Sequence, residues 1–116
     1  MLPMNGPQLL AAAMDCFAKG DLEGAIAAAR RAIEAEPVSP ASPVIIDAYE
    51  MLGEFCSQAG RLDEAIAAAK KLLELDPWSA MGHANLSRYY MLMGDKTTAE
   101  EWLEKSRKLP PGVSKT

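Results

Sequence analysis

The stretch Gly60-Arg61-Leu62-Asp63-Glu64-Ala65 decides the fold, because two related stretches stand elsewhere in the chain. Gly20-Asp21-Leu22-Glu23-Gly24-Ala25 resembles it closely, and Gly94-Asp95-Lys96-Thr97-Thr98-Ala99 is a weaker copy. A period of about 34 residues with helical patterning is typical of stacked helix hairpins, and the spacing from Gly60 to Gly94 has this period. The spacing from Gly20 to Gly60 is slightly longer, which indicates a short insertion between the first two copies.

A proline follows each of these glycines at the same distance, at Pro37, Pro77 and Pro111. Glycine readily takes the left-handed conformation that ends a helix, and the residue before a proline is pushed out of the helical region. The pattern therefore predicts units of two helices, with a glycine turn inside each unit and a proline at its end.

Hydrophobic spacing and capping residues predict six helices, which we expect to pack antiparallel because most of their connections are short. The expected helices are residues 7–19, 22–36, 44–59, 62–75, 80–93 and 96–108. Residues 37–43 are an insertion that we expect to form a surface loop without a site. Residues 110–116 are predicted to be a flexible tail.

The composition fits one domain, residues 1–116, with 49% hydrophobic residues, 24% charged residues and a net charge of −4. Lysine and arginine are scattered among carboxylates, so we expect no nucleic-acid binding. No apolar run approaches the ~18 residues that span a bilayer, and no secretory signal is evident. We therefore expect a cytoplasmic protein that has no membrane partner.

The residues that could carry chemistry are few. His83 is the only histidine, and no cysteine or histidine pair has the spacing of a metal site. Cys16 and Cys56 occupy the same position of two repeats and are expected to pack as small hydrophobic residues. His83 is likewise expected to pack rather than to catalyse. The sequence thus predicts neither an enzyme, nor a metal site, nor a cofactor.

The repeats resemble the tetratricopeptide repeat family, whose pattern has an aromatic residue, Leu-Gly and Tyr on the first helix, Gly at the turn, Ala on the second helix and Pro at the end. In these terms the repeats span residues 6–39, 46–79 and 80–113. The second matches best, with Tyr49, Leu52, Gly53, Gly60, Ala65 and Pro77 in place and Cys56 at the Tyr position. The third keeps Leu86, Tyr90, Gly94, Ala99 and Pro111, and the first keeps Gly20, Ala25, Ala32 and Pro37.

The resemblance implies an all-α fold, a right-handed superhelical stack of three antiparallel helix hairpins. It also implies a protein-interaction module. The first helices of the repeats would line a concave groove that binds a peptide or a helix of another protein.

One stripe of the second repeat is acidic, since it contains Asp47, Glu50 and Glu54, and by the family's geometry it faces this groove. The expected partner-binding residues are these three acids with apolar and basic residues from the neighbouring repeats: Met14, Phe17, Asp47, Glu50, Glu54, Met81, Arg88 and Met91. Such a groove suits a basic or amphipathic segment. Alternatively, the acidic stripe is only a solvated helix face.

The family's known clamp for a carboxylate at a chain end uses Lys, Arg and Asn on the first helices. This groove has only Arg88, with Asn85 beside it, and three acids at its centre. Recognition of a C-terminal carboxylate is therefore not expected.

A second hypothesis is that the chain self-associates as a structural or assembly protein. We expect no further helix after the last repeat, because Pro110 and Pro111 come directly after it. Trp102 and Leu103 would then be partly uncovered, and pairing of two such ends about a twofold axis would hide them. This predicts a homodimer through the last two helices, including Trp102.

Overall fold

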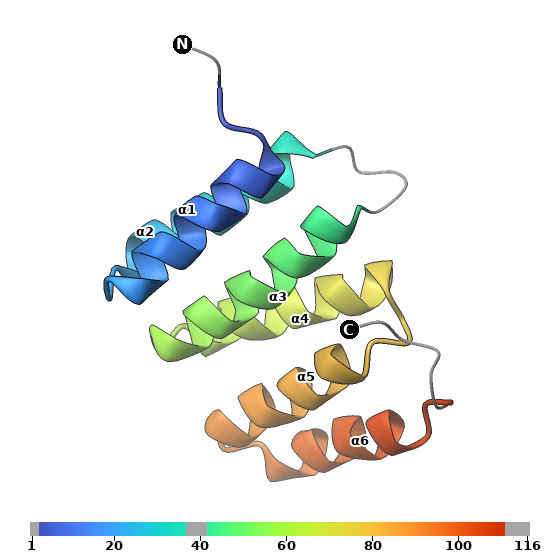
Figure 1. Ribbon diagram of the computed structural model, residues 1–116. Helices are drawn as coiled ribbons and strands as arrows, with labels where there is room; N and C mark the ends of the chain where they lie inside the picture. Colours follow the sequence, from blue (N-terminus) through green and yellow to red (C-terminus); the bar gives the residue numbers. More distant parts are fainter. Residues whose placement is uncertain (1–2, 37–41, 111–116) are drawn as a thin grey trace.

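The computed structural model describes residues 3–36 and 42–110, and it contains six α-helices and no strand in these two ranges (Figure 1). The helices are α1 (Gly6–Ala18), α2 (Leu22–Ala35), α3 (Pro43–Gln58), α4 (Leu62–Leu75), α5 (Ala80–Leu92) and α6 (Lys96–Arg107). Each predicted helix is confirmed, with ends that differ by a residue at most. Most of the predicted loop, residues 37–41, and the tail from residue 111 onward lie outside the described residues.

Capping side chains explain where the helices begin. Asp21, Ser42, Ser79 and Asp95 each accept a hydrogen bond from a backbone N–H in the first turn. Asn5 forms a capping box with Gln8, so α1 begins at Gly6, just before the predicted start.

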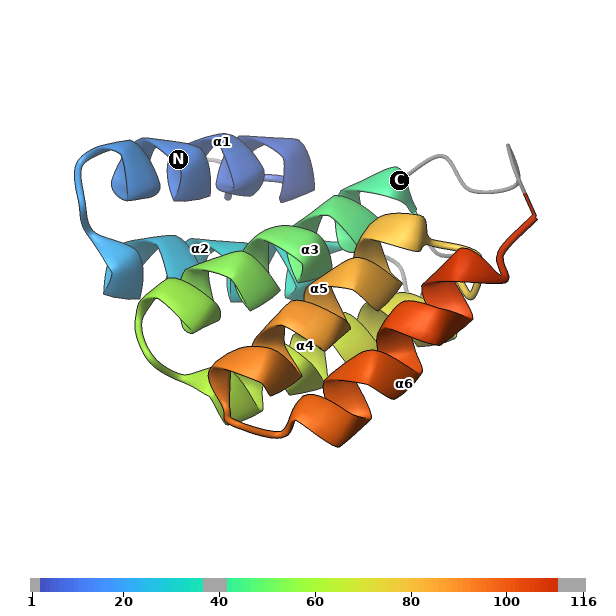
Figure 2. The same cartoon turned by 90° about the horizontal axis from the view of Figure 1, so that it is seen from below.

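The three hairpins stack side by side, so that α1, α3 and α5 form one layer and α2, α4 and α6 form the other (Figures 1 and 2). Each helix packs against the next helix along the chain, and α1 also contacts α3. The predicted all-α stack of three helix hairpins is confirmed.

Small residues let the two helices of a hairpin approach closely. Ala25, Ala65 and Ala99, which follow the three turns, are completely buried. A Cβ atom on Gly53 would lie 3.5 Å from the carbonyl oxygen of Ala65. At the matching position of the third repeat, the Ser87 hydroxyl donates a 2.7 Å hydrogen bond to the carbonyl oxygen of Ala99.

Two aromatic residues on α3 and α5 join the repeats, and they occupy equivalent positions of the second and third repeats. Phe55 is 3% exposed and stacks on Phe17 of the first repeat, with ring centroids 5.1 Å apart. Tyr89 is fully buried against Gly53 of the second repeat. At the equivalent position of the first repeat stands Asp15, which is exposed.

Ion pairs join the first two repeats on the layer formed by α2, α4 and α6, which we call the outer layer. The Arg61 guanidinium binds Glu23 of α2 at 2.7 Å and also binds Glu64 of α4. Arg30 of α2 binds the same Glu64 at 2.9 Å. These exposed pairs link α2 to α4 and to the turn before α4.

The turn glycines have the left-handed backbone that the sequence predicts. Gly20, Gly60 and Gly94 have φ angles of 81°, 78° and 89°, and a Cβ atom at any of them would meet nothing within 4 Å. Only the conformational preference of the backbone therefore requires glycine at these turns.

Gly60→Ala is expected to lower the free energy of unfolding by about 1–2 kcal/mol, the cost of a left-handed conformation for an ordinary residue. Urea unfolding followed by circular dichroism measures this change. Gly60→Asn is the matched control and should lose less, because asparagine tolerates this conformation. An unchanged Gly60→Ala variant would contradict the conformational explanation.

Candidate functional site

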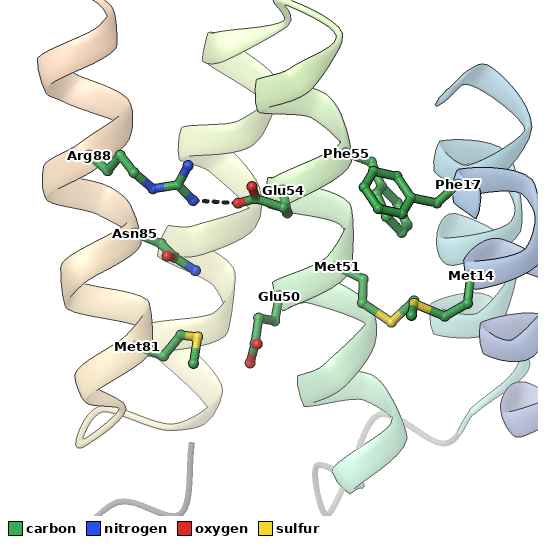
Figure 3. Close-up of a pocket in the computed structure, with 9 residues that line it drawn as sticks. All are labelled: Met14, Phe17, Glu50, Met51, Glu54, Phe55, Met81, Asn85 and Arg88. Carbon is green, nitrogen blue, oxygen red and sulfur yellow. Dashed lines mark hydrogen bonds and ion pairs between the residues drawn. The ribbon is translucent and has the colours of Figure 1, made fainter. Parts of the chain in front are cut away.

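A groove crosses the layer formed by α1, α3 and α5, which we call the inner layer. Its walls are α1 and α5, and α3 lies between them (Figure 3). Its volume is about 340 Å³, and it is open to solvent. Nine residues from these three helices line it: Met14, Phe17, Glu50, Met51, Glu54, Phe55, Met81, Asn85 and Arg88.

The side of the groove between α1 and α3 is apolar. Met14 and Met51 point toward each other from the two helices, and Phe17 stacks on Phe55 about one turn further along the same helices (Figure 3). Met14 is 54% exposed, which is high for a large apolar side chain. Exposed methionines on a groove are typical of adaptable contact surfaces.

The side between α3 and α5 is polar, and an ion pair bridges it. Arg88 of α5 binds the Glu54 carboxylate of α3, and its guanidinium carbon lies 5.1 Å from the centre of the Tyr89 ring. Gln58 and Tyr89 donate weaker hydrogen bonds of 3.4 Å to the same carboxylate. Burial alone would raise the pKa of Glu54, but the hydrogen bond and charge of Arg88, with the bonds from Gln58 and Tyr89, lower it below its usual value.

Glu50 lies one helical turn before Glu54, and its pKa shifts in the opposite direction. It forms no ion pair with any residue of the described ranges. Burial raises the pKa of Glu50, and the negative charges of Asp47 and Glu54 raise it further. Glu50 therefore keeps its carboxylate in the groove at a cost in free energy.

Most of the predicted site residues meet in this groove. Six of the eight line it, namely Met14, Phe17, Glu50, Glu54, Met81 and Arg88. The other two do not: Asp47 is an exposed residue one turn before Glu50, and Met91 is 49% exposed one turn beyond Arg88. Of the three acids expected at the centre, Glu50 and Glu54 line the groove, and Arg88 pairs with Glu54.

Sequence reasoning missed Met51 and Phe55 as lining residues. Met51 follows Glu50, and Phe55 follows Glu54. Because Met51 and Phe55 are four residues apart, they lie along one face of α3, as the two acids do. This spacing is the feature of the sequence that indicates Met51 and Phe55 as lining residues.

Opposite shifts in pKa predict opposite effects of removing the two acids. Glu50→Gln should raise the free energy of unfolding at pH 7, whereas Glu54→Gln should lower it, each by less than about 1 kcal/mol because both groups are partly solvated. The ordinary glutamate value is 4.5. Below it Glu50 is protonated in both the folded and unfolded states, so the Glu50→Gln difference should vanish there. The contribution of Glu54 is present above 4.5 and is lost as the pH falls through its lower folded value.

Urea unfolding at several pH values between about 3.5 and 7 measures both effects. Wild-type protein at each pH is the reference. Two variants that shift stability in the same direction would contradict the assignment of Glu54 as the paired acid and Glu50 as the unpaired one.

The cysteines and the histidine lie away from the groove lining. Cys56 is buried in the core, where burial raises the pKa of its thiol, and Cys16 is half-buried. His83 is buried, with its Nδ1 atom 2.8 Å from the carbonyl oxygen of Ser79. Among the residues the structure describes, no group of His, Cys, Asp and Glu side chains could hold a metal ion. In the same ranges, none of the helices combines the length and apolar character needed to cross a membrane.

The predicted dimer surface on α6 is only partly exposed. Trp102 is half-buried against the core, with its ring 5.8 Å from the His83 ring and 4.2 Å from the Lys105 ammonium group. Leu103 is 37% exposed. The end of α5 carries three more exposed apolar side chains, those of Met91, Leu92 and Met93.

Solved structures of other proteins share this fold. Two crystal structures of MamA superpose on this chain with TM-scores of 0.79 and 0.78, at 23% and 24% sequence identity. The matches cover 90% and 88% of this chain, which spans 57% and 52% of the length of those MamA chains. At such identities the likeness concerns the fold. No curated protein sequence matches the chain.

Two models of the tetratricopeptide repeat match the sequence, one over residues 10–80 and the other over residues 57–112. Together they cover the repeats from α1 to the end of α6. The first match alone takes in more than half of the chain. The chain therefore belongs to the tetratricopeptide repeat family, whose repeats form non-catalytic scaffolds for interaction between proteins.

Proposed function

We propose that this protein binds a segment of a partner protein, a peptide or a helix, in the groove formed by α1, α3 and α5. The observation that carries the proposal is the groove itself, an open channel of about 340 Å³. Exposed methionines lie on both of its walls, with Met14 at 54% and Met81 at 44% exposure. Apolar side chains held in water at a concave surface favour an occupant that covers them.

The residues proposed to bind the partner are those predicted from the sequence, now with two additions. Met14, Phe17, Glu50, Glu54, Met81 and Arg88 would line the bound segment, with Met51 and Phe55 beneath it. Asp47 and Met91 would act at the margins, one turn beyond the lining. The carboxylates favour a partner with a basic or amphipathic segment.

A pull-down with matched variants tests this proposal. Met81→Glu places a charge in the groove, and Ala27→Glu places the same charge on an exposed position of α2, in the outer layer. Both positions are exposed, so both variants should fold. A partner retained by Ala27→Glu and lost by Met81→Glu would support groove binding, whereas equal retention by both variants would contradict it.

Self-association is the second candidate, and the exposed apolar side chains of the third repeat favour it. Leu92 is 57% exposed and Met93 is 42% exposed, at the tip of the last hairpin. The equivalent residues of the second repeat are Gln58 and Ala59, so this accumulation of apolar side chains distinguishes the third repeat from the second. A second copy of the chain would cover them in a homodimer through α5 and α6.

Leu103→Glu is expected to convert such a homodimer to a monomer without unfolding the first two repeats, because Leu103 is exposed whereas Trp102 also packs inside its own chain. Sedimentation at several concentrations measures the oligomeric state. Trp102→Glu should give a monomer too, but with some loss of stability in the third repeat. A wild-type chain that sediments as a monomer at high concentration would contradict the homodimer.

A further inference from the structure

The groove has two chemically different halves that adjoin on α3. Met51 faces Met14 on the apolar half, and Glu50, the residue before it, faces α5 on the polar half (Figure 3). Consecutive residues of one helix project in different directions, so a single turn of α3 supplies both halves. An occupant that fills both halves would therefore need an apolar and a polar side chain side by side, an arrangement that residues three or four apart on one helix face provide.

The charges of the polar half are unevenly compensated. Arg88 is bound to Glu54 and lies over the ring of Tyr89, so its guanidinium already has a carboxylate and an aromatic partner. Glu50 has no ion-pair partner in the described parts of the chain, and the exposed Asp47 lies one turn away. The polar half is thus a subsite with a net negative charge, centred on Glu50. The one cation among its lining residues, Arg88, is already paired with Glu54.

We propose that the groove selects an amphipathic helix of a partner protein, which places an apolar side chain between Met14 and Met51 and a lysine or arginine beside Glu50. This inference rests on the proposed function and specifies its partner. The Glu54–Arg88 pair acts as the selectivity element, because it withholds Arg88 from carboxylates of the occupant while leaving Glu50 free for a cation. Methionine side chains adapt to the shape of the helix that binds them.

The probes are four labelled peptides of about 14 residues with blocked ends and one leucine stripe at helical spacing. Three of them differ only in the residue one turn after the central leucine, which is lysine, glutamine or glutamate. The fourth is the lysine peptide with a proline in its middle, which breaks the helix. Fluorescence anisotropy measures the dissociation constant of each peptide.

The wild-type protein is expected to prefer lysine over glutamine by about fivefold, and glutamine over glutamate by about the same factor, as for a partly solvated charge pair. Glu50→Gln should abolish the preference for lysine over glutamine without weakening the glutamine peptide. Glu54→Gln should release Arg88 and improve binding of the glutamate peptide by about fivefold. Ala27→Glu, on the outer layer, should reproduce the wild-type order.

The outcomes separate this inference from the proposed function. If all peptides bind equally and Met81→Glu abolishes their binding, the groove binds partners but the acidic subsite is wrong. If the proline peptide binds as well as its parent, the occupant is extended rather than helical. Failure of every peptide to bind would overturn the amphipathic helix as the occupant, whereas binding that Met81→Glu leaves unchanged would overturn the groove as the binding site.

Discussion

Phe55→Ala is expected to lower the free energy of unfolding by about 3–5 kcal/mol, the usual cost of truncating a buried phenylalanine. Phe55 is 3% exposed, and it stacks on Phe17 at the junction between the first and second repeats. The variant would leave a cavity there and remove an aromatic contact between the two units. Such a loss is a large share of the roughly 5–15 kcal/mol that stabilises a domain.

The position of the cavity predicts how the stability is lost. Repeat proteins are held together by contacts between neighbouring units, so weakening one junction should uncouple the first repeat from the others. Amide hydrogen exchange should therefore become faster in α1 and α2 than in α5 and α6. Phe17→Ala is the comparison, with a smaller loss because Phe17 is only half-buried. Uniformly faster exchange in all six helices would contradict the uncoupling.

The fold could be predicted from the sequence because its signals are local and repeated. The glycine of each turn, the capping residue that follows it and the helical spacing of alanines are all read within a short stretch of sequence. Gly60 and Asp21 are examples, and the structure gives the first a φ of 78° and makes the second a cap. Three copies of one pattern then predict the stacking.

The candidate site could be predicted only in part, because it depends on pairings between repeats. The stripe of Glu50 and Glu54 is visible as a helix face, yet the sequence alone does not indicate that Arg88, in the next repeat, pairs with Glu54. Glu54 and Arg88 are 34 residues apart, so they occupy equivalent positions of the second and third repeats, but the repeat period does not specify that these two side chains form an ion pair. Asp47, which the stripe includes, lies one turn outside the groove lining.

The junction between the second and third repeats provides the second large prediction. Tyr89→Ala is expected to lower the free energy of unfolding by about 3–5 kcal/mol, since Tyr89 is the largest side chain that is fully buried. The exchange of amide hydrogens should become faster in α5 and α6, the reverse of the pattern expected for Phe55→Ala. Chemical unfolding and hydrogen exchange measure the two effects.

Tyr89→Phe is the matched control, because it keeps the ring and removes only the hydroxyl. Its hydrogen bond to Glu54 is long, 3.4 Å, so the loss of stability should stay below about 1 kcal/mol. The pKa of Glu54 should rise slightly, because one of the hydrogen bonds that lower it is gone. Titration of the Glu54 carboxyl by NMR tests this coupling. If Tyr89→Phe destabilises the protein as much as Tyr89→Ala, then the hydroxyl rather than the ring joins the repeats, and the core and the groove are linked through that one hydrogen bond.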